Sequence, residues 1–201
     1  MARIALIMTG ASGSAYGMRL SEQLVGLGHE LVFCATDAGR EICAHELGFE
    51  LPLGGADAAA IALATFLDLP SAERLRVVYP GDMLDGIASG SYPLDAVIVA
   101  PASMGFCASI ASGAAADLPE RACDVALKER RPLVVVPRET PLSLVHLRNL
   151  TTITEAGAIV VPAMPAFYSK PESVDDLISF VAGKVLDVLG IEHSLYERWG
   201  V

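Results

Sequence analysis

Near its amino end the chain reads Arg3-Ile4-Ala5-Leu6-Ile7-Met8-Thr9-Gly10-Ala11-Ser12-Gly13-Ser14-Ala15-Tyr16-Gly17. The apolar run Arg3–Met8 has the length and composition of a buried strand. The loop of small residues that follows opens a helix, where free backbone N–H groups and the helix dipole favour a phosphate. A tight strand-to-helix turn that needs glycine is the structural alternative.

The same order of strand, turn and helix recurs along the chain. Apolar runs rich in β-branched residues predict strands at Arg3–Met8, Glu30–Ala35, Arg76–Tyr79, Ala96–Ala100, Leu133–Val136 and Ala158–Val161. Helices are predicted at Ala15–Leu27, Ala38–Leu47, Ala56–Leu67, Met104–Ser112, Glu120–Glu129, Pro141–Ala156 and Val174–Gly190. We therefore expect one α/β domain over residues 1–201, a doubly wound, Rossmann-like or flavodoxin-like parallel sheet of about six strands flanked by helices. Ligands should bind beyond the carboxyl ends of its strands.

The composition supports this fold and excludes several partners. Hydrophobic residues make up 53% of the chain and aromatic residues 6%, so the core is built mainly from Ala, Val, Ile and Leu. A net charge of −10 argues against broad attraction to nucleic acid or to an anionic membrane. The segment Met1–Met8 has no apolar stretch long enough for a signal or a span, so we expect a cytoplasmic protein.

No metal site is expected from the cysteines and histidines. The cysteines are Cys34, Cys43, Cys107 and Cys123, and the histidines are His29, His45, His146 and His193. Neither set has CxxC, HxxxH or HExxH spacing. The pattern predicts ordinary buried thiols.

Two further loops could join the first one in a ligand site. Ala88–Pro93 supplies hydroxyls and precedes the strand Ala96–Ala100, while Ala100–Gly105 follows that strand. We expect all three loops to face one crevice and to surround a mononucleotide. Taken alone, Ala88–Pro93 is more often a mere turn. The loop after the first strand does not have GxGxxG spacing, and Thr36 rather than an acidic residue follows the second strand, so the pattern does not favour NAD.

Basic residues gather between Glu120 and Pro141 in this acidic protein. Arg121 and Lys128 are two helical turns apart and share a face. They are expected to form a second phosphate pocket with Arg138, Tyr168 and Lys184. Ion pairs with neighbouring glutamates are the alternative. Arg130 and Arg131 are interpreted as solvated residues at a helix end.

Two carboxylates are candidates for acid–base chemistry. Glu139 stands at the carboxyl end of a strand in Pro137-Arg138-Glu139-Thr140-Pro141, where two prolines fix the backbone. Glu46 lies on the second predicted helix, a place where a glutamate is usually solvated.

The chain resembles the flavin prenyltransferases of the UbiX type, within the wider group of homo-oligomeric flavin-containing Cys decarboxylase-like proteins. The likeness covers nearly the whole chain and is carried by Met8–Gly13, Ser89–Ser91, Glu120–Pro141, Pro165–Tyr168 and Arg198–Gly200. It implies an enzyme that transfers a dimethylallyl group from dimethylallyl phosphate to N5 and C6 of reduced FMN, without a metal. The product, prenylated FMN, is the cofactor of UbiD-type decarboxylases. The resemblance also implies a homo-oligomer, a dodecamer, in which neighbours complete the active site.

The resemblance assigns roles to individual residues. For FMN it implies Gly10, Ala11, Ser12, Thr36, Ser89, Gly90, Ser91, Tyr92 and Arg121. For the allylic phosphate it implies Lys128, Arg138, Tyr168 and Lys184. The catalytic candidates are Glu139, Glu46, Ser12 and Lys128. Lys184 replaces a frequent arginine and Ala102 a common cysteine, which leaves open the preference between mono- and diphosphate donors.

Two other functions remain as alternatives. A flavin-dependent decarboxylase of cysteine-type substrates would use a histidine base after the second strand and an Asn-bearing third loop. Here His45 is misplaced and Ser103 is followed by Met104-Gly105. A non-catalytic FMN-binding partner of a decarboxylase would need the FMN loops but not the basic cluster.

Overall fold

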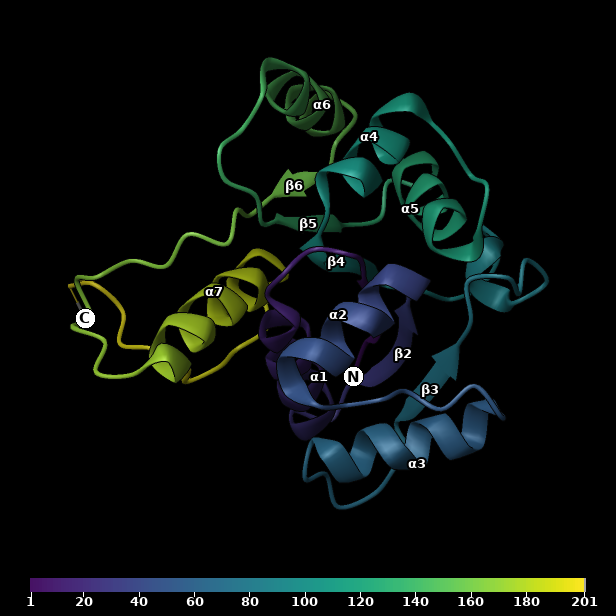
Figure 1. Ribbon diagram of the computed structural model, residues 1–201, viewed down its shortest axis with the longest axis horizontal. Coiled ribbons are helices and arrows are strands. Elements are labelled where there is room, and N and C mark those ends of the chain that lie inside the picture. The colour runs from purple at the N-terminus through teal and green to yellow at the C-terminus, as the bar shows by residue number, and fades with distance from the viewer. Residues whose placement is uncertain (201) are drawn as a thin grey trace.

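Strand and helix alternate along the whole chain in the computed structural model, which describes residues 1–200 (Figure 1). The strands are β1 Arg3–Met8, β2 Glu30–Ala35, β3 Leu75–Val78, β4 Ala96–Ala102, β5 Leu133–Pro137 and β6 Ile159–Val160. The helices are α1 Ser14–Gly26, α2 Asp37–Leu47, α3 Ala56–Phe66, α4 Met104–Ser112, α5 Leu118–Lys128, α6 Leu144–Glu155 and α7 Val174–Val188, with a short 3-10 helix η1 at Gly86–Ala88. These elements confirm the predicted order of strands and helices.

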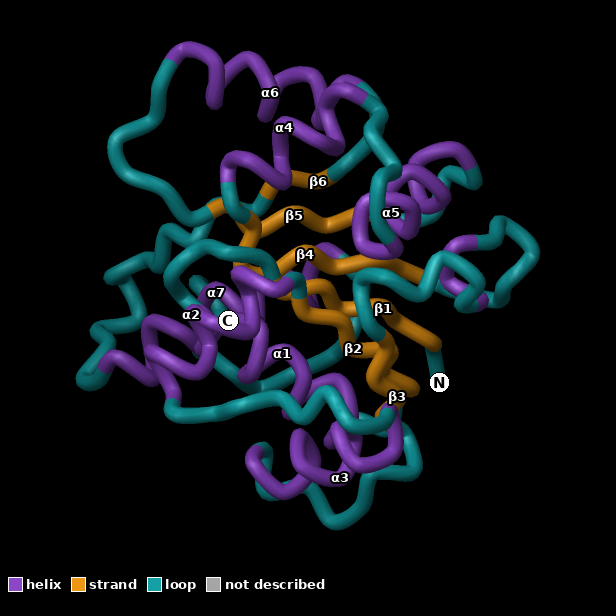
Figure 2. The backbone as a smooth tube through the Cα atoms, turned by 45° about the vertical axis from the view of Figure 1, so that its right-hand side comes forward, coloured by secondary structure: helices purple, strands orange, loops and turns teal. Residues whose placement is uncertain are grey.

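The strands form one parallel sheet in the order β3-β2-β1-β4-β5-β6. Figure 2 shows this order across the molecule. The chain first builds outward from β1 to β3, then returns to lay β4 on the other side of β1. The carboxyl ends of β1 and β4 are therefore the switch point, where doubly wound sheets bind ligands. The predicted six-stranded doubly wound sheet is confirmed.

Alternate side chains of each strand enter two separate cores. Ile4, Leu6 and Met8 pack with α1, α2, α3 and α7. Ala5 and Ile7 pack on the opposite face, with α4, α5 and α6. The two layers of helices lie on either side of the sheet in Figure 1. Because both faces are covered, the central strands β1 and β4 are apolar except for Arg3 at the start of β1.

Element ends differ from prediction where capping residues decide them. α5 begins at Leu118, before the predicted Glu120, because Asp117 caps it and Pro119 fits the first turn. α6 begins at Leu144, after the predicted Pro141, because Ser143 caps it. None of the helices within residues 1–200 combines the length and apolar character that a bilayer crossing requires.

Candidate functional site

Thr9 ties together the two loops at the switch point. The residue directly follows β1 and is only 2% exposed. Its amide and its hydroxyl both donate to the carbonyl of Pro101, at 3.1 and 2.9 Å, and its Oγ1 accepts from the amide of Ser103 at 2.7 Å. The loops after β1 and β4 are therefore fixed to each other, which places two of the three predicted loops at the same edge of the sheet.

Glu46 occupies the amino end of α1. From α2 its carboxylate accepts the amides of Gly13, at 3.1 and 3.0 Å, and of Ser14, at 2.8 Å. The predicted free N–H groups at this helix start are therefore already bound at Gly13 and Ser14. A carboxylate at this position is favoured by the helix dipole.

The environment of Glu46 keeps it ionised. Partial burial acts to raise the pKa of Glu46, but hydrogen bonds from Ser12 and from the amides of Ser14 and Gly13 outweigh it and bring the pKa below its ordinary value. At neutral pH the side chain is an acceptor that holds Ser12 and α1 in place.

Arg138 brings the end of β5 to the same loop. Its Nε donates to the carbonyl of Ser12 at 2.9 Å. The next residue, Glu139, is exposed, and its Oε1 accepts the amide of Thr140 at 2.9 Å. The structure thus places the Arg138 cation against the loop that follows β1, and Glu139 follows Arg138 at the end of β5.

The end of β2 completes this edge of the sheet. Thr36 caps α2 by accepting the amide of Gly39 on its hydroxyl at 3.1 Å. Gly10 lies so close to α2 that an added Cβ would stand 2.6 Å from the Cβ of Ala38. We call the predicted site residues of this edge the carboxyl-edge group: Gly10, Ala11, Ser12, Thr36, Glu46, Arg138 and Glu139.

A second set of predicted residues lies at the opposite edge of the sheet. The carbonyl of Pro93 accepts from Arg3, the first residue of β1, and the ring of Tyr92 lies 5.2 Å from the Arg3 guanidinium. The carbonyl of Gly90 accepts from Arg131, just before β5, at 2.5 Å. We call the residues here the amino-edge group: Ser89, Gly90, Ser91, Tyr92, Arg121, Lys128 and Arg131.

Donors are concentrated in the amino-edge group. The hydroxyls of Ser89 and Ser91 are 2.9 Å apart and exposed. Nη1 of Arg131 is buried without a hydrogen-bond partner. Arg121 donates to the carbonyl of Ala88 at 3.1 Å, and Lys128 pairs with Glu129. Both cations lie on α5 beside this loop, and the pair of Lys128 with Glu129 is one of the ion pairs expected under the alternative interpretation.

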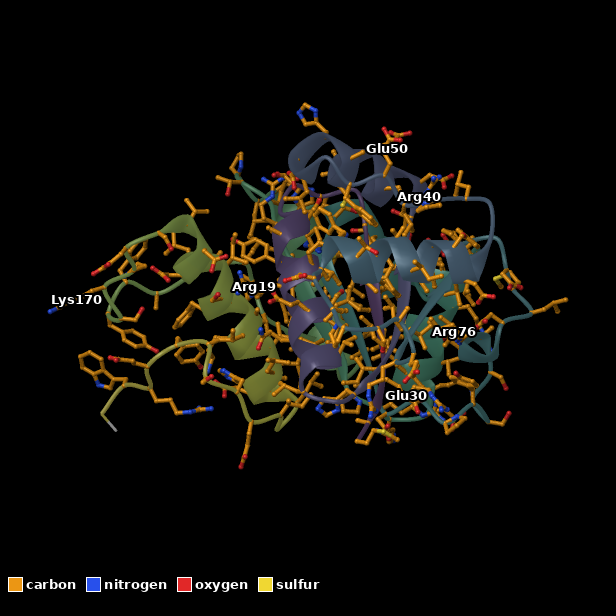
Figure 3. All side chains as sticks on the ribbon, turned by 90° about the horizontal axis from the view of Figure 1, so that it is seen from below. Arg19, Glu30, Arg40, Glu50, Arg76 and Lys170 are labelled. Atoms are coloured by element: carbon orange, nitrogen blue, oxygen red, sulfur yellow. The ribbon has the colours of Figure 1, made fainter. Side chains whose placement is uncertain are left out.

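The expectation that all three loops face one crevice is wrong within a single chain. Ala88–Pro93 precedes β4, so it lies at the amino ends of the strands, whereas the other two loops follow strands. β1 has six residues, which separates the edges by roughly 17 Å at about 3.3 Å per step. Figure 3 shows the same separation, with Glu30 and Arg76 on one side and Arg40 and Glu50 on the other.

The predicted second phosphate pocket is also not assembled in one chain. Tyr168 packs edge-on against Phe180 of α7, with ring centroids 5.8 Å apart, and Lys184 pairs with Asp187 on the same helix at 3.3 Å. Lys128 lies on α5, which covers the opposite face of the sheet from α7 (Figures 1 and 2). Of this set, only Arg138 lies beside the switch point.

Sequence reasoning missed three residues. Thr9 was noted only as part of a loop, although its place directly after β1 was a usable signal. Arg131 was interpreted as solvated, which is wrong because it binds Gly90. Asp187 gave no signal, since its partners come from a segment whose path the sequence does not reveal.

The thiols behave as predicted. All four cysteines are buried. Burial raises the pKa of Cys43 to about 11 and that of Cys107 to about 12. Among residues 1–200 no group of three or more His, Cys, Asp or Glu side chains is placed to hold a metal ion.

Comparison with known proteins agrees with this architecture. The Flavoprotein family model matches residues 1–186. The flavin prenyltransferase UbiX of Methanothermobacter thermautotrophicus is 45% identical over 196 residues, covering 98% of this chain and 94% of that protein. A UbiX protein solved with FMN and dimethylallyl pyrophosphate matches with a TM-score of 0.87 and 36% identity, over 100% of this chain and 98% of that one. A dodecameric FMN-dependent UbiX-like decarboxylase from Escherichia coli O157:H7 matches with a TM-score of 0.86 and 36% identity, over 99% and 100% of the two chains. The chain therefore belongs to the UbiX flavin prenyltransferase family of flavoproteins.

Proposed function

We propose that this protein is a flavin prenyltransferase, which moves a dimethylallyl group from an allylic phosphate to N5 and C6 of reduced FMN. The observation that carries the proposal is the meeting of Ser12, Glu46 and Arg138 at the switch point, with Glu139 following Arg138 in the chain, in a member of the UbiX family. The loop of small residues leaves room for a ligand. A cation beside it suits the departure of a phosphate, and a carboxylate suits the removal of a proton.

The donor set of the chain fits FMN as the prenyl acceptor. The exposed Gly10 and Ser12 allow close approach of a flat ring beside Thr36. The paired, exposed hydroxyls of Ser89 and Ser91 suit the FMN phosphate. Tyr92, Gly90, Ala11 and Arg121 belong to the same two groups and complete the proposed flavin contacts.

Departure of the allylic phosphate is assigned to cations. Breaking the allylic C–O bond leaves negative charge on the phosphate, and preorganised donors stabilise that charge as it develops. Arg138, Lys128 and Lys184 are the proposed cations, and the Tyr168 hydroxyl is a proposed further donor. A lysine at position 184 contributes a point charge rather than a bidentate fork.

Proton handling is assigned mainly to Glu139. Bonding of flavin N5 to the primary allylic carbon breaks the C–O bond to phosphate and releases the N5 proton. Bonding of flavin C6 to the tertiary carbon consumes the double bond, so a proton must be added to the middle allylic carbon and the C6 proton must leave. Glu139 is exposed at the end of β5 and is the proposed base. Glu46, with its lowered pKa, is a weak base, and its proposed role is to orient Ser12.

The site requires a second copy of the chain. The carboxyl-edge and amino-edge groups lie at opposite ends of the strands, with the buried sheet between them, so we assign the two groups around one FMN to different subunits. In a homo-oligomer the amino edge of one subunit can cover the carboxyl edge of another. A dodecamer, like that of the Escherichia coli relative, is the proposed assembly. The UbiD-type decarboxylase partner and the cytoplasmic location stay predictions.

The direct test is anaerobic incubation of the protein with reduced FMN and dimethylallyl phosphate, followed by mass analysis of the flavin. One added dimethylallyl unit per flavin is the expected product. A parallel arm with dimethylallyl diphosphate decides donor preference. Binding of FMN with an unchanged flavin mass in both arms would instead favour the non-catalytic FMN-binding alternative.

A further inference from the structure

Asp187 in α7 accepts hydrogen bonds from several side chains of the carboxyl-terminal segment. Oδ1 of Asp187 accepts from Arg198 at 2.7 Å and is 3.2 Å from Nε2 of His193. Oδ2 accepts from the Tyr196 hydroxyl and, at 3.3 Å, from Nζ of Lys184. The two oxygens of a carboxylate offer about four acceptor positions, so the four donors occupy all the acceptor positions of Asp187.

The hydrogen bonds of His193 fix its role in this cluster. Its Nδ1 accepts the amide of Leu195 at 3.1 Å, so the neutral ring carries its proton on Nε2 and donates to Asp187. The side chain is 1% exposed. Partial burial acts to raise the pKa of Asp187, but the donors from Tyr196, Arg198, Lys184 and His193 outweigh it and hold the pKa well below its ordinary value.

The segment His193–Trp199 packs back along α7. The ring of Tyr196 lies 4.8 Å from that of Phe180, and the ring of Trp199 lies 5.3 Å from that of Tyr168. Figure 1 shows this end of the chain beside the segment that leads from β6 to α7, away from the sheet. The carboxyl-terminal segment therefore touches both sequence positions assigned to the allylic phosphate on this side, Tyr168 directly and Lys184 through Asp187.

A glycine on α7 makes this packing possible. An added Cβ at Gly183 would stand 2.6 Å from Cε1 of Tyr196 and 2.7 Å from Cε1 of His193. Both neighbours are ring atoms held by Asp187, so they cannot move aside without loss of those hydrogen bonds. Glycine at a helix interior is otherwise unfavourable, which agrees with a packing requirement.

We propose that Asp187 is a positioning residue, which fastens the carboxyl-terminal segment to α7 and thereby sets Tyr168 and Lys184 for the phosphate of the allylic donor. The inference rests on the proposed function. Lys184 makes the longest of the four contacts and its side chain is 45% exposed, so it can turn to an arriving phosphate while Asp187 stays held by the other three donors.

Two variants perturb this arrangement by different routes, and a third is a matched control. Asp187→Asn keeps the size of the side chain but replaces one acceptor oxygen with an NH2 group, which faces the donors that Asp187 binds. Gly183→Ala displaces the rings of Tyr196 and His193 and leaves the Asp187 carboxylate intact. Asp175→Asn, on the same helix, removes only an ion pair with Arg19. The prenyl transfer rate is measured against donor concentration at saturating reduced FMN, with FMN affinity measured separately.

We expect kcat/KM for dimethylallyl phosphate to fall about tenfold or more in Asp187→Asn and Gly183→Ala, with FMN affinity within about twofold of wild type. Asp175→Asn should match wild type in both. Trp199 is the only tryptophan in the chain, so its fluorescence anisotropy reports the segment directly. Its fast component should grow in the first two variants and not in the control.

Two results would overturn the inference in an active wild-type enzyme. The first is a fast component of the Trp199 anisotropy that is no larger in Asp187→Asn and Gly183→Ala than in wild type. The other is a released segment with unchanged kcat/KM for the donor, which would make the contact purely structural. A wild-type enzyme that leaves reduced FMN unmodified would fail at the earlier step, overturning the proposed function together with the substrate that Asp187 is proposed to serve.

Discussion

The two edges of the sheet are built in different ways. At the carboxyl edge, the loops are held by buried or backbone-directed bonds, such as those of Thr9 to Pro101 and of Glu46 to Gly13. At the amino edge, the loop Ala88–Pro93 carries exposed hydroxyls and lies beside the long side chain of Lys128. Its carbonyls accept hydrogen bonds from Arg131 and Arg121, which belong to other segments of the chain. The carboxyl edge is therefore held rigidly by its own hydrogen bonds, whereas the amino edge exposes hydrogen-bond donors at the surface.

The difference indicates how the proposed site is divided. A rigid platform can hold a flavin ring, whereas outward-facing donors suit a phosphate that belongs to a ligand on a neighbouring subunit. Because roughly 17 Å separates the edges, each edge should serve a different site of the oligomer. Substitutions at one edge at a time test this division.

The largest effect is expected from pairing two inactive variants. Glu139→Gln at the carboxyl edge and Lys128→Ala at the amino edge should each lower prenyl transfer at least about 100-fold, by loss of a base and of a charge donor. When the two variants are co-expressed with different tags, about a quarter of the sites should draw both intact edges from different subunits. Activity of the doubly purified mixture is the measurement.

The control is each variant co-expressed with a differently tagged copy of itself. Activity no higher in the mixed oligomer than in these controls would mean that each site comes from a single chain, against the division proposed here.

The next effect separates two arginines, one at each edge, that are proposed to bind different ligands. Arg121→Ala should weaken FMN binding about 10- to 100-fold, because a charged hydrogen bond contributes about 1.5–3 kcal/mol. Arg138→Ala should leave FMN affinity within a few fold and raise KM for dimethylallyl phosphate. Flavin fluorescence titration and steady-state kinetics measure the two quantities, and the opposite pattern would mean that the two arginines have been assigned to the wrong ligands.

Most of the fold could be predicted from the sequence, because strand periodicity is local. β1 and β2 have the predicted bounds, whereas α5 and α6 start at caps, Asp117 and Ser143, that the apolar pattern does not register. The site was predicted less well. Strand polarity alone places the loop before β4 at the amino edge, because this loop precedes a strand whereas the other two loops follow strands. The contacts of Asp187 could not have been predicted, since they depend on how the carboxyl-terminal segment turns back.

A smaller effect concerns stability at the two edges. Thr9→Val should lower the free energy of unfolding by about 1–3 kcal/mol, because the part-buried amide of Ser103 loses its acceptor. Ser89→Ala should change it by less than about 0.5 kcal/mol, since this hydroxyl is exposed. Thermal unfolding at one protein concentration compares them. Equal losses would show that the carboxyl edge is no more rigidly held than the amino edge.

The smallest effect is a pH dependence that only the carboxyl edge should show. The folded-state pKa of Glu46 is lowered, so its stabilising contribution is present above the ordinary glutamate pKa and is lost as the pH falls through the folded value. Glu46→Gln should therefore be less stable than wild type at pH 7, by less than about 1 kcal/mol after solvent screening, and the difference should shrink below about pH 4. The pKa of Glu129 is also lowered, by its hydrogen bond with Lys128, but that pair is on the surface, so Glu129→Gln should unfold at the wild-type temperature at both pH values. A pH-independent loss in Glu46→Gln would mean that packing of the side chain, and not its charge on the amides of α1, holds this edge.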